Sequence, residues 1–323
     1  MAQPTHPTNN NTTLDATASF LKDFTLGGVS GAVAKTMTAP IERVKLLLQT
    51  MHANPRILSG EIPPYKGIVD CFRRVAAEQG LPSFWRGNLT NVIRYFPTQA
   101  FNFAFKDSIK MLFPRYDPTA QFGQFFLVQM ASGGLAGAGS LCLVYPLDYA
   151  RTRLAADAGK GAKRDFNGLA DCLAKTARGP RGLLGLYNGF GVSVAGIIPY
   201  RGVYFGLYDS LREKNPWKND LGTLGMASKF GVAQTTALAA AYASYPFDTV
   251  RRRLQMGSDK AKEASLYKGA VDCFCKIVRE EGVRALYHGA YANVFRTVGS
   301  ALVLVFYDQL QGMLGLNLGA GSE

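Results

Sequence analysis

Acidic and basic side chains recur at fixed positions after three prolines, and this recurrence is the most informative chemical pattern in the sequence. Each proline is followed by an acid two residues later and by a base five residues later. On a helix such an acid and base share one face, so each pair could be local, at an ordinary helix end. Because charges close to a membrane interior are costly unless paired, three copies favour one ring, here called the first ring, in which the pairs form between repeats. The three sets are Pro40 with Glu42 and Lys45, Pro146 with Asp148 and Arg151, and Pro246 with Asp248 and Arg251.

A second set of acids and bases, here called the second ring, follows an aromatic residue near the end of each repeated stretch. Its members are Asp107 and Lys110, Asp209 and Arg212, and Asp308 and Gln311. If the segments before them are membrane helices, the second ring lies at the opposite end from the first. Two rings that break in turn can open a central site to one side of a membrane at a time. This arrangement predicts alternating access through two gates.

Three bases lie deep within apolar segments. Arg94 precedes Asp107 by 13 residues, which is about 19 Å along a helix. Arg296 precedes Asp308 by 12 residues, and Lys35 lies in the first apolar segment. Each base could be paired inside the protein or extend to the membrane surface, but their depth makes the second difficult. Three unpaired bases at mid-depth would form a phosphate site, because guanidinium groups bind phosphoryl oxygens in a bidentate manner.

Tyrosines recur every four residues at Tyr200, Tyr204 and Tyr208, which places them on one face of a helix. About one turn earlier, Gly196 and Ile197 leave a flat apolar patch. Aromatic faces of this kind can stack on a nucleotide base, although the same stripe is also compatible with ordinary helix packing.

Landmarks of several kinds recur three times in the same order, about 100 residues apart. Gly67, Gly168 and Gly269, each in a string of the Y-K-G type, are separated by 101 residues both times. The chain is therefore a triplicated unit. Its first 19 residues contain no Lys, no Arg and no apolar run, which excludes a secretory signal or an arginine-rich transit peptide. The expected parts are a disordered tail at 1–19, repeats at 20–117, 118–218 and 219–314, and a C-terminal tail at 315–323.

The composition fits a membrane protein with a polar interior. Of the 323 residues, 47% are hydrophobic and 18% are charged, which excludes a disordered chain. The stretches 118–147, 182–200 and 230–247 contain no Asp, Glu, Lys or Arg and are long enough to cross a bilayer as helices. The mean hydropathy is nevertheless close to zero, so polar residues must face inward. With two spans in each repeat, we predict an all-α membrane protein with six transmembrane helices around a central cavity.

Other classes of function have little support in the sequence. The net charge of +13 indicates an anionic partner, but there is no G-x-x-x-x-G-K-[ST] loop for phosphoryl chemistry. The five cysteines form no C-x-x-C pair and only three histidines are present. We therefore expect reduced cysteines and no metal site. A soluble basic enzyme or a nucleic-acid-binding protein is disfavoured on the same grounds.

The repeated acid–base patterns are similar to those of the mitochondrial carrier family, from about Phe20 to Leu314. Within that family, A-P-I-E-R-V-K-L-L-L-Q at 39–49, R-Y-F-P-T-Q-A-F-N-F-A-F-K-D at 94–107 and Y-P-F-D-T-V-R-R-R at 245–253 resemble members that exchange ADP for ATP. The resemblance implies a transporter and not an enzyme. It implies a monomer in the inner mitochondrial membrane that exchanges cytosolic ADP for matrix ATP without a cofactor or metal.

The resemblance also implies roles for particular residues. The first ring is the gate on the matrix side, and the second ring is the gate on the cytoplasmic side. Structural cardiolipin is implied where the repeated glycines precede helix N-termini, which attract phosphates. The implied nucleotide-contacting positions are Lys35, Arg94, Gly196, Ile197, Tyr200, Ser244 and Arg296.

The string at 251–256 departs from the family pattern. Such carriers usually continue three arginines with three methionines, whereas this chain has Arg251-Arg252-Arg253-Leu254-Gln255-Met256. Gln255 and Gln49 each lie nine residues after a first-ring proline, so we predict two glutamine braces that hydrogen-bond across the first ring and stiffen it. Ala155 holds this place in the second repeat and cannot act as a brace. The departure leaves open a divergent carrier for another adenine nucleotide or nucleotide-like anion.

Overall fold

The structure is a computed structural model that describes residues 10–114, 116, 121–159, 164–218, 220, 222–257, 265–297 and 299. Within this part of the chain every regular element is helical and no strand is present. The predicted all-α architecture is therefore confirmed.

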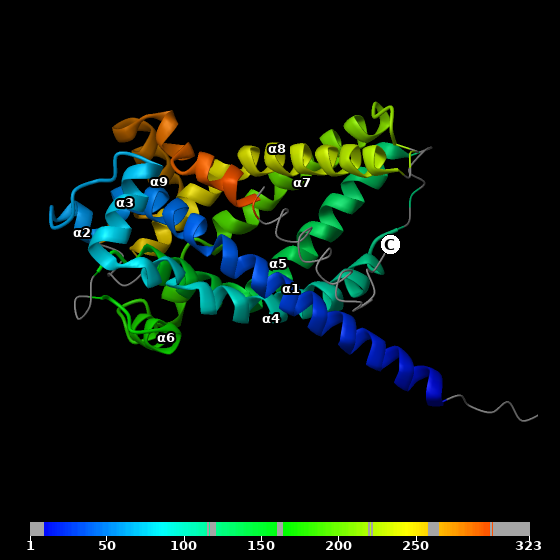
Figure 1. Cartoon of the computed structure of the whole chain (residues 1–323), viewed down its shortest axis with the longest axis horizontal. Helices are drawn as coiled ribbons and strands as arrows, with labels where there is room; N and C mark the ends of the chain where they lie inside the picture. Colours follow the sequence, from blue (N-terminus) through cyan, green and yellow to red (C-terminus); the bar gives the residue numbers. More distant parts are fainter. Residues whose placement is uncertain are drawn as a thin grey trace, which may run out of the picture.

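The described residues form five long helices and the beginning of a sixth, which matches two long helices for each repeat. The helices converge at one end of the bundle and diverge toward the other (Figure 1). They are α1 (Asn10–Thr50), α4 (Asn88–Lys110), α5 (Phe122–Ala156), α7 (Phe190–Glu213), α8 (Thr223–Met256) and a helical segment over residues 290–297.

Helix α1 begins earlier than the sequence indicated. A disordered tail was expected through residue 19, but the helix starts at Asn10. Residues 10–19 contain neither proline nor glycine, so nothing in them ends a helix. This end of α1 extends beyond the other helices in Figure 1.

Two stretches of the described chain are long and apolar enough to cross a membrane by length and composition alone. They are Gly123–Ala156 and Gly182–Glu213. Helices α1 and α4 carry Lys35 and Arg94 within their length. A helix that lines a polar interior carries such residues and has a lower apolar content than one buried in lipid. The prediction of six spans therefore rests on the threefold repeat more than on hydropathy.

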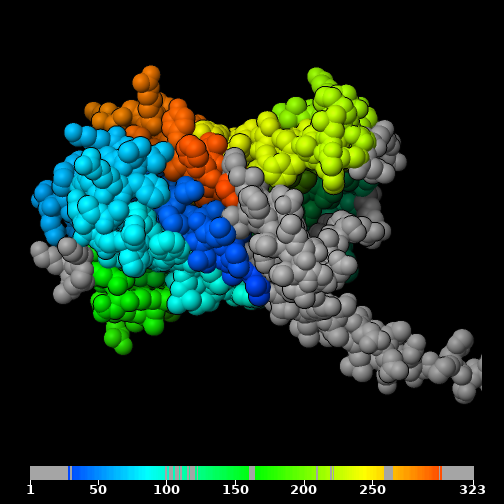
Figure 2. Space-filling view, viewed as in Figure 1, coloured from blue at the N-terminus to red at the C-terminus, as the bar shows by residue number. Residues whose placement is uncertain are grey.

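A short helix separates the two long helices of each repeat, at the end where the bundle converges (Figure 1). The three are α3 (Ile68–Gln79), α6 (Leu169–Ala177) and α9 (Ala270–Lys276), and all three lie at this end of the molecule in Figure 2. Each begins directly after the glycine that marks its repeat. The remaining elements are η1 (Met51–Ala53), α2 (Pro55–Leu58), η2 (Leu81–Trp85), η4 (Gly182–Tyr187), η5 (Ile277–Glu281) and η6 (Val283–Tyr287).

Each short helix packs through a cysteine. Cys71, Cys172 and Cys273 are completely buried in three separate apolar clusters, one in each repeat. Burial raises the pKa of the Cys71 and Cys273 thiols to about 12, so these groups stay protonated. All five cysteines are free, as the sequence predicts.

Each repeat approaches the next through a glycine that precedes its second long helix. These glycines have φ between +80° and +84°, which glycine adopts without strain. A Cβ atom there would also lie between 2.9 and 3.1 Å from the carbonyl oxygen of a first-ring base in the following repeat. Since repeat 3 contacts repeat 1 in the same way, the three repeats close around one axis. The pairs are Gly87 with Arg151, Gly189 with Arg251, and Gly289 with Lys45.

Candidate functional site

The first ring forms three ion pairs, and each pair joins two different repeats. Lys45 Nζ lies 3.0 Å from Asp248 Oδ2, joining repeats 1 and 3. Glu42 pairs with Arg151 between repeats 1 and 2, and Asp148 pairs with Arg251 between repeats 2 and 3. Each acid follows a proline inside α1, α5 or α8, where the missing backbone hydrogen bond favours a bend. The contacts are between repeats, so the interpretation as local helix-end pairs is wrong.

Arg252 joins the ring although it lies outside the repeated pattern. Its guanidinium lies 3.3 Å from a carboxylate oxygen of Asp148 and 3.3 Å from one of Asp248. It also donates to the hydroxyl of Thr152. Because its side chain is almost completely buried, these contacts neutralise a charge that would otherwise be costly. The sequence marked Arg252 only as part of an unusual string.

The two glutamines cross the interfaces between repeats, and Gln49 reaches a carboxylate of the ring. The Gln49 amide donates to Asp248 Oδ2 at 3.2 Å and to Thr249 Oγ1 at 3.0 Å. The Gln255 amide donates to the Tyr145 hydroxyl at 3.1 Å. Both side chains are completely buried. Gln49 therefore braces repeats 1 and 3, and Gln255 braces repeats 3 and 2 through a tyrosine that the sequence did not identify.

The other residues of the Arg251–Met256 string pack within repeat 3 or contact repeat 2. Arg253 forms a two-point ion pair with Glu281 of its own repeat. Leu254 and Met256 are buried in the apolar cluster of repeat 3. The backbone oxygen of Met256 accepts from Arg153 of repeat 2.

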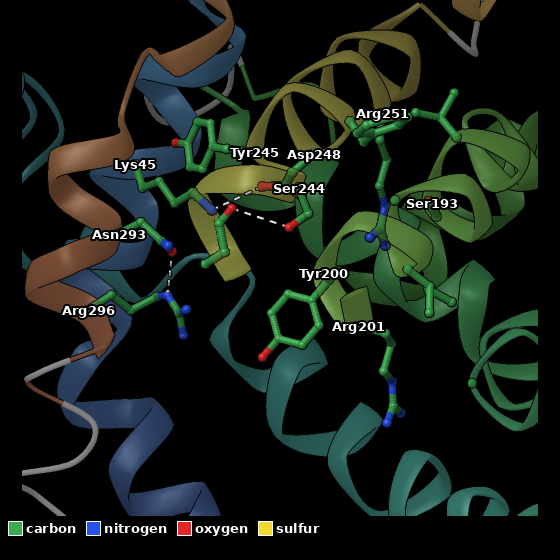
Figure 3. Close-up of a pocket in the computed structure, with 16 residues that line it drawn as sticks. Lys45, Ser193, Tyr200, Arg201, Ser244, Tyr245, Asp248, Arg251, Asn293 and Arg296 are labelled. Carbon is green, nitrogen blue, oxygen red and sulfur yellow. Dashed lines mark hydrogen bonds and ion pairs between the residues drawn. The ribbon is translucent and has the colours of Figure 1, made fainter. Parts of the chain in front are cut away.

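A cavity of about 440 Å³ lies directly against the first ring (Figure 3). Lys45, Asp248 and Arg251 form its wall on the ring side. Its other wall includes five of the seven nucleotide-contacting positions that the resemblance implied. These five are Gly196, Ile197, Tyr200, Ser244 and Arg296.

The three deep bases are close to other polar or aromatic groups, and the prediction that all three are unpaired is wrong for Arg94, which lies near a first-ring carboxylate. Arg296 Nε donates to Asn293 Oδ1 at 3.1 Å, as Figure 3 shows. Arg94 lies 3.7 Å from Asp148 and so contacts the ring itself. Lys35 Nζ lies 5.4 Å from the ring centre of Tyr95. The contact between Arg94 and Asp148 was not predicted, because the sequence does not give the distance between α4 and α5.

The tyrosine stripe on α7 is a continuous stack of rings. The ring centres of Tyr200 and Tyr204 are 6.0 Å apart, with 15° between the ring planes. Tyr204 and Tyr208 are 5.9 Å apart, with 5° between their planes. Tyr200 lines the cavity, and the stack continues from it toward the C-terminal end of α7.

Ser193, Arg201 and Asn293 line the cavity but were missed from the sequence. Helical spacing could have identified two of them. Ser193 lies four residues before Ile197, and Asn293 lies three residues before Arg296, so each shares a helix face with a residue that was identified.

The second ring falls mostly outside the described part of the chain. This applies to Asp308 and Gln311, and to the side chains of Asp107, Lys110 and Asp209. Arg212 is exposed in the last turn of α7. The second ring therefore stays a prediction.

Comparison with known proteins agrees with the threefold organisation. A family model described as mitochondrial carrier protein matches residues 16–117, 123–217 and 222–318. The chain is 56% identical over 299 residues to an ADP,ATP carrier protein of Parachlorella kessleri, covering 93% of this chain and 86% of that protein. It is 53% identical over 298 residues to ADP/ATP translocase 3 of Bos taurus and of Homo sapiens, covering 92% of this chain and 98% of each relative. The chain belongs to the mitochondrial carrier protein family.

Proposed function

We propose that this protein is a transporter that exchanges ADP for ATP across the inner mitochondrial membrane. Relatives that are 53–56% identical over most of the chain carry the names ADP/ATP translocase and ADP,ATP carrier protein. The observation that carries the proposal is the composition of the central cavity, in which a guanidinium and an aromatic ring line the same space.

The cavity offers separate surfaces to the two ends of a nucleotide. Arg296 supplies a planar cation that suits phosphoryl oxygens, and Arg94 and Lys35 would add charge beside the ring. Gly196 and Tyr200 present a small and an aromatic surface on α7, where an adenine could stack. The cavity volume of about 440 Å³ is within the range usual for ligand sites of this size.

The unusual Leu254-Gln255 pair does not change this surface. Leu254 packs inside repeat 3, and Gln255 lies behind the ring against Tyr145. Neither is among the residues that line the cavity. The Leu254-Gln255 pair therefore affects the gate and not the nucleotide site. Since the nucleotide site keeps the residues that the resemblance implied, we favour ADP and ATP as substrates over another nucleotide-like anion.

Alternating access is proposed from the state of the first ring. With its three ion pairs formed, the cavity is closed at the end where the short helices lie, which is the matrix side in the orientation that the family resemblance implies. The second ring would close the opposite end when the first opens. Because ATP carries one more negative charge than ADP, a membrane potential would drive the exchange by about 2.3 kcal/mol for each 100 mV.

Cardiolipin and a monomeric state are also proposed. An apolar hollow of about 330 Å³ lies between α7, α8 and α9, lined by Val192, Phe247, Val271 and Phe274 among others. The N-terminus of α9 is adjacent, since Ala270 also lines this hollow. An acyl chain fits the apolar lining, and free N–H groups at the helix start can donate hydrogen bonds to a phosphate. Three repeats of one chain enclose the cavity, so a partner chain is not needed to build it.

The test is uptake of labelled ADP into liposomes that contain the purified protein. Separate preparations are loaded with ATP, GTP, inorganic phosphate or buffer alone. We expect rapid uptake only with internal ATP. Equal uptake with every internal solution indicates a uniporter, and equal uptake with GTP indicates a site that does not select adenine. Either result contradicts the proposal.

A further inference from the structure

Two histidines and a glutamate meet at the interface between repeats 1 and 3. His52 lies in η1 at the end of α1, Glu281 ends η5, and His288 directly follows η6. One potential ligand atom from each residue lies within 4.8 Å of those of the other two. The sequence predicted no metal site because it has no C-x-x-C pair and only three histidines. The fold brings these three residues together although they are far apart in the chain.

The threefold repeat explains why His288 faces His52. Arg86 and Asn188 occupy the equivalent position in repeats 1 and 2, immediately before the positive-φ glycine. Arg86 donates to the carbonyl of Gly159, and Asn188 donates to a carbonyl at the end of α8, so each side chain caps the next repeat. In repeat 3 the next repeat is repeat 1, and the histidine is directed to the end of α1.

The site is more than a chance meeting of side chains. The Nδ1 atom of His288 is buried and has no hydrogen-bond partner within the described residues. The rings of His52 and His288 are 5.8 Å apart, and His52 Nε2 lies 3.7 Å from Glu281 Oε2. Arg253 binds both oxygens of the Glu281 carboxylate, with 2.8 Å between Arg253 Nη2 and Glu281 Oε2, and so holds it in place. Metal-binding carboxylates are commonly oriented by such a partner, which leaves a lone pair on each oxygen for the metal.

We propose that His52, Glu281 and His288 bind a first-row transition-metal dication of the Zn²⁺ type. Two imidazoles and one carboxylate are a ligand set that Zn²⁺ accepts, with bonds of about 2.0–2.1 Å, so tetrahedral ligands lie about 3.3 Å apart. The present separations of up to 4.8 Å require only a small closing movement of the side chains. Mg²⁺ demands octahedral oxygen ligands and is excluded by the same chemistry.

The surroundings allow metal entry and binding. About a third of the His52 side chain and a fifth of the Glu281 side chain are exposed, so an ion can enter and a water molecule can complete its coordination.

Such a metal would act on the gate. His52 belongs to repeat 1, whereas Glu281 and His288 belong to repeat 3. The same two repeats are joined by the Lys45–Asp248 ion pair and by Gln49. A bound ion would therefore hold this interface closed and slow the opening of the first ring, and this consequence rests on the proposed exchange function.

Metal binding is tested first on the purified full-length protein without an affinity tag, by equilibrium dialysis against Zn²⁺ and by the absorption spectrum of Co²⁺. The variants are His52→Gln and His288→Asn, the second of which introduces the residue type that repeat 2 has at this position. His6→Gln is the matched control, because it removes the histidine of the N-terminal tail. We expect about one Zn²⁺ for each chain in the unchanged protein and in the control, with affinity at least tenfold weaker in either site variant. Equal binding in all four proteins would overturn the proposal.

The gating consequence is tested on the same proteins in ATP-loaded liposomes. Each exchange rate with Zn²⁺ is divided by the rate of the same protein without Zn²⁺. Chelation of nucleotide by Zn²⁺ affects all proteins equally, so a difference between them reports the site. The expected result is slowing in the unchanged protein and in His6→Gln, and little slowing in His288→Asn. Equal slowing in all of these proteins would overturn the inference that the bound metal holds the gate closed. Absence of any exchange without Zn²⁺ would instead refute the proposed function, while the dialysis result would still decide the metal site.

Discussion

Replacing Gln255 by methionine tests whether the second brace holds the first ring. The side chain is completely buried, and its amide donates to the Tyr145 hydroxyl at 3.1 Å. Its oxygen accepts a longer hydrogen bond of 3.5 Å from Arg252. Methionine fills a similar volume but makes neither bond. Loss of one neutral hydrogen bond and one weak contact to a charged group costs about 1–2 kcal/mol, which changes the population of the closed ring about 5- to 30-fold.

Two readouts measure this effect. In detergent, the midpoint of thermal unfolding of Gln255→Met should fall by about 2–5 °C. In ATP-loaded liposomes, ADP uptake should accelerate, because the barrier to opening the ring is lower. Gln49→Met should have the larger effect, about 2–3 kcal/mol, since Gln49 donates to the charged Asp248 carboxylate.

Leu254→Met is the matched control, because Leu254 is a buried apolar neighbour that makes no brace. A volume-conserving change of this kind should cost less than about 1.5 kcal/mol. If Gln255→Met has the same unfolding midpoint and the same exchange rate as the unchanged protein, Gln255 does not stabilise the first ring.

Two further predictions follow from the ring and its supporting turns. Glu42→Arg should reduce the rate of ADP uptake at least about 100-fold, because it places a base beside Arg151. The added change Arg151→Glu should recover at least tenfold of that loss. No recovery in the double variant would contradict a direct ion pair between the two residues. Gly189→Ala should lower the unfolding midpoint by several degrees, since φ is +84° and the new Cβ would lie 3.1 Å from the Arg251 carbonyl oxygen. Gly168→Ala is its control, with extended backbone and no atom within 4 Å of a new Cβ, and equal losses in the two variants would show that the close approach is unimportant.

Repetition made much of the gate predictable from the sequence. Three acids and three bases at equal spacing can form a closed ring when each repeat pairs with the next, and the structure has this arrangement for Lys45 with Asp248. The stacking of Tyr200 and Tyr204 follows from helical spacing alone, because residues four apart lie on one face. Such patterns can be recognised in the sequence alone, because threefold symmetry or helical geometry determines how the residues lie in space.

The parts that could not be predicted depend on distances between helices. Arg94 reaches Asp148 because α4 lies close to α5, and no spacing along the chain indicates this approach. The contact of Gln255 with Tyr145 has the same origin. His288 met His52 only because repeat 3 adjoins repeat 1, and the equivalent residues of the other repeats are not histidines. Sites that depend on a residue type found in one repeat are hidden from a search for repeated patterns.

Alternating access requires the first ring to open during each cycle of exchange. This is tested by cross-linking repeats 1 and 3 in the double variant Gln49→Cys/Thr249→Cys with a short bifunctional thiosulfonate reagent. The native Gln49 Nε2 and Thr249 Oγ1 atoms are 3.0 Å apart, so the cross-link would hold this interface closed. ADP uptake into ATP-loaded liposomes is then followed before the reagent, after it and after reduction, with each single variant as the control for the five native cysteines. We expect uptake to stop in the double variant alone and to resume on reduction. Uninterrupted exchange with the cross-link intact would contradict this expectation.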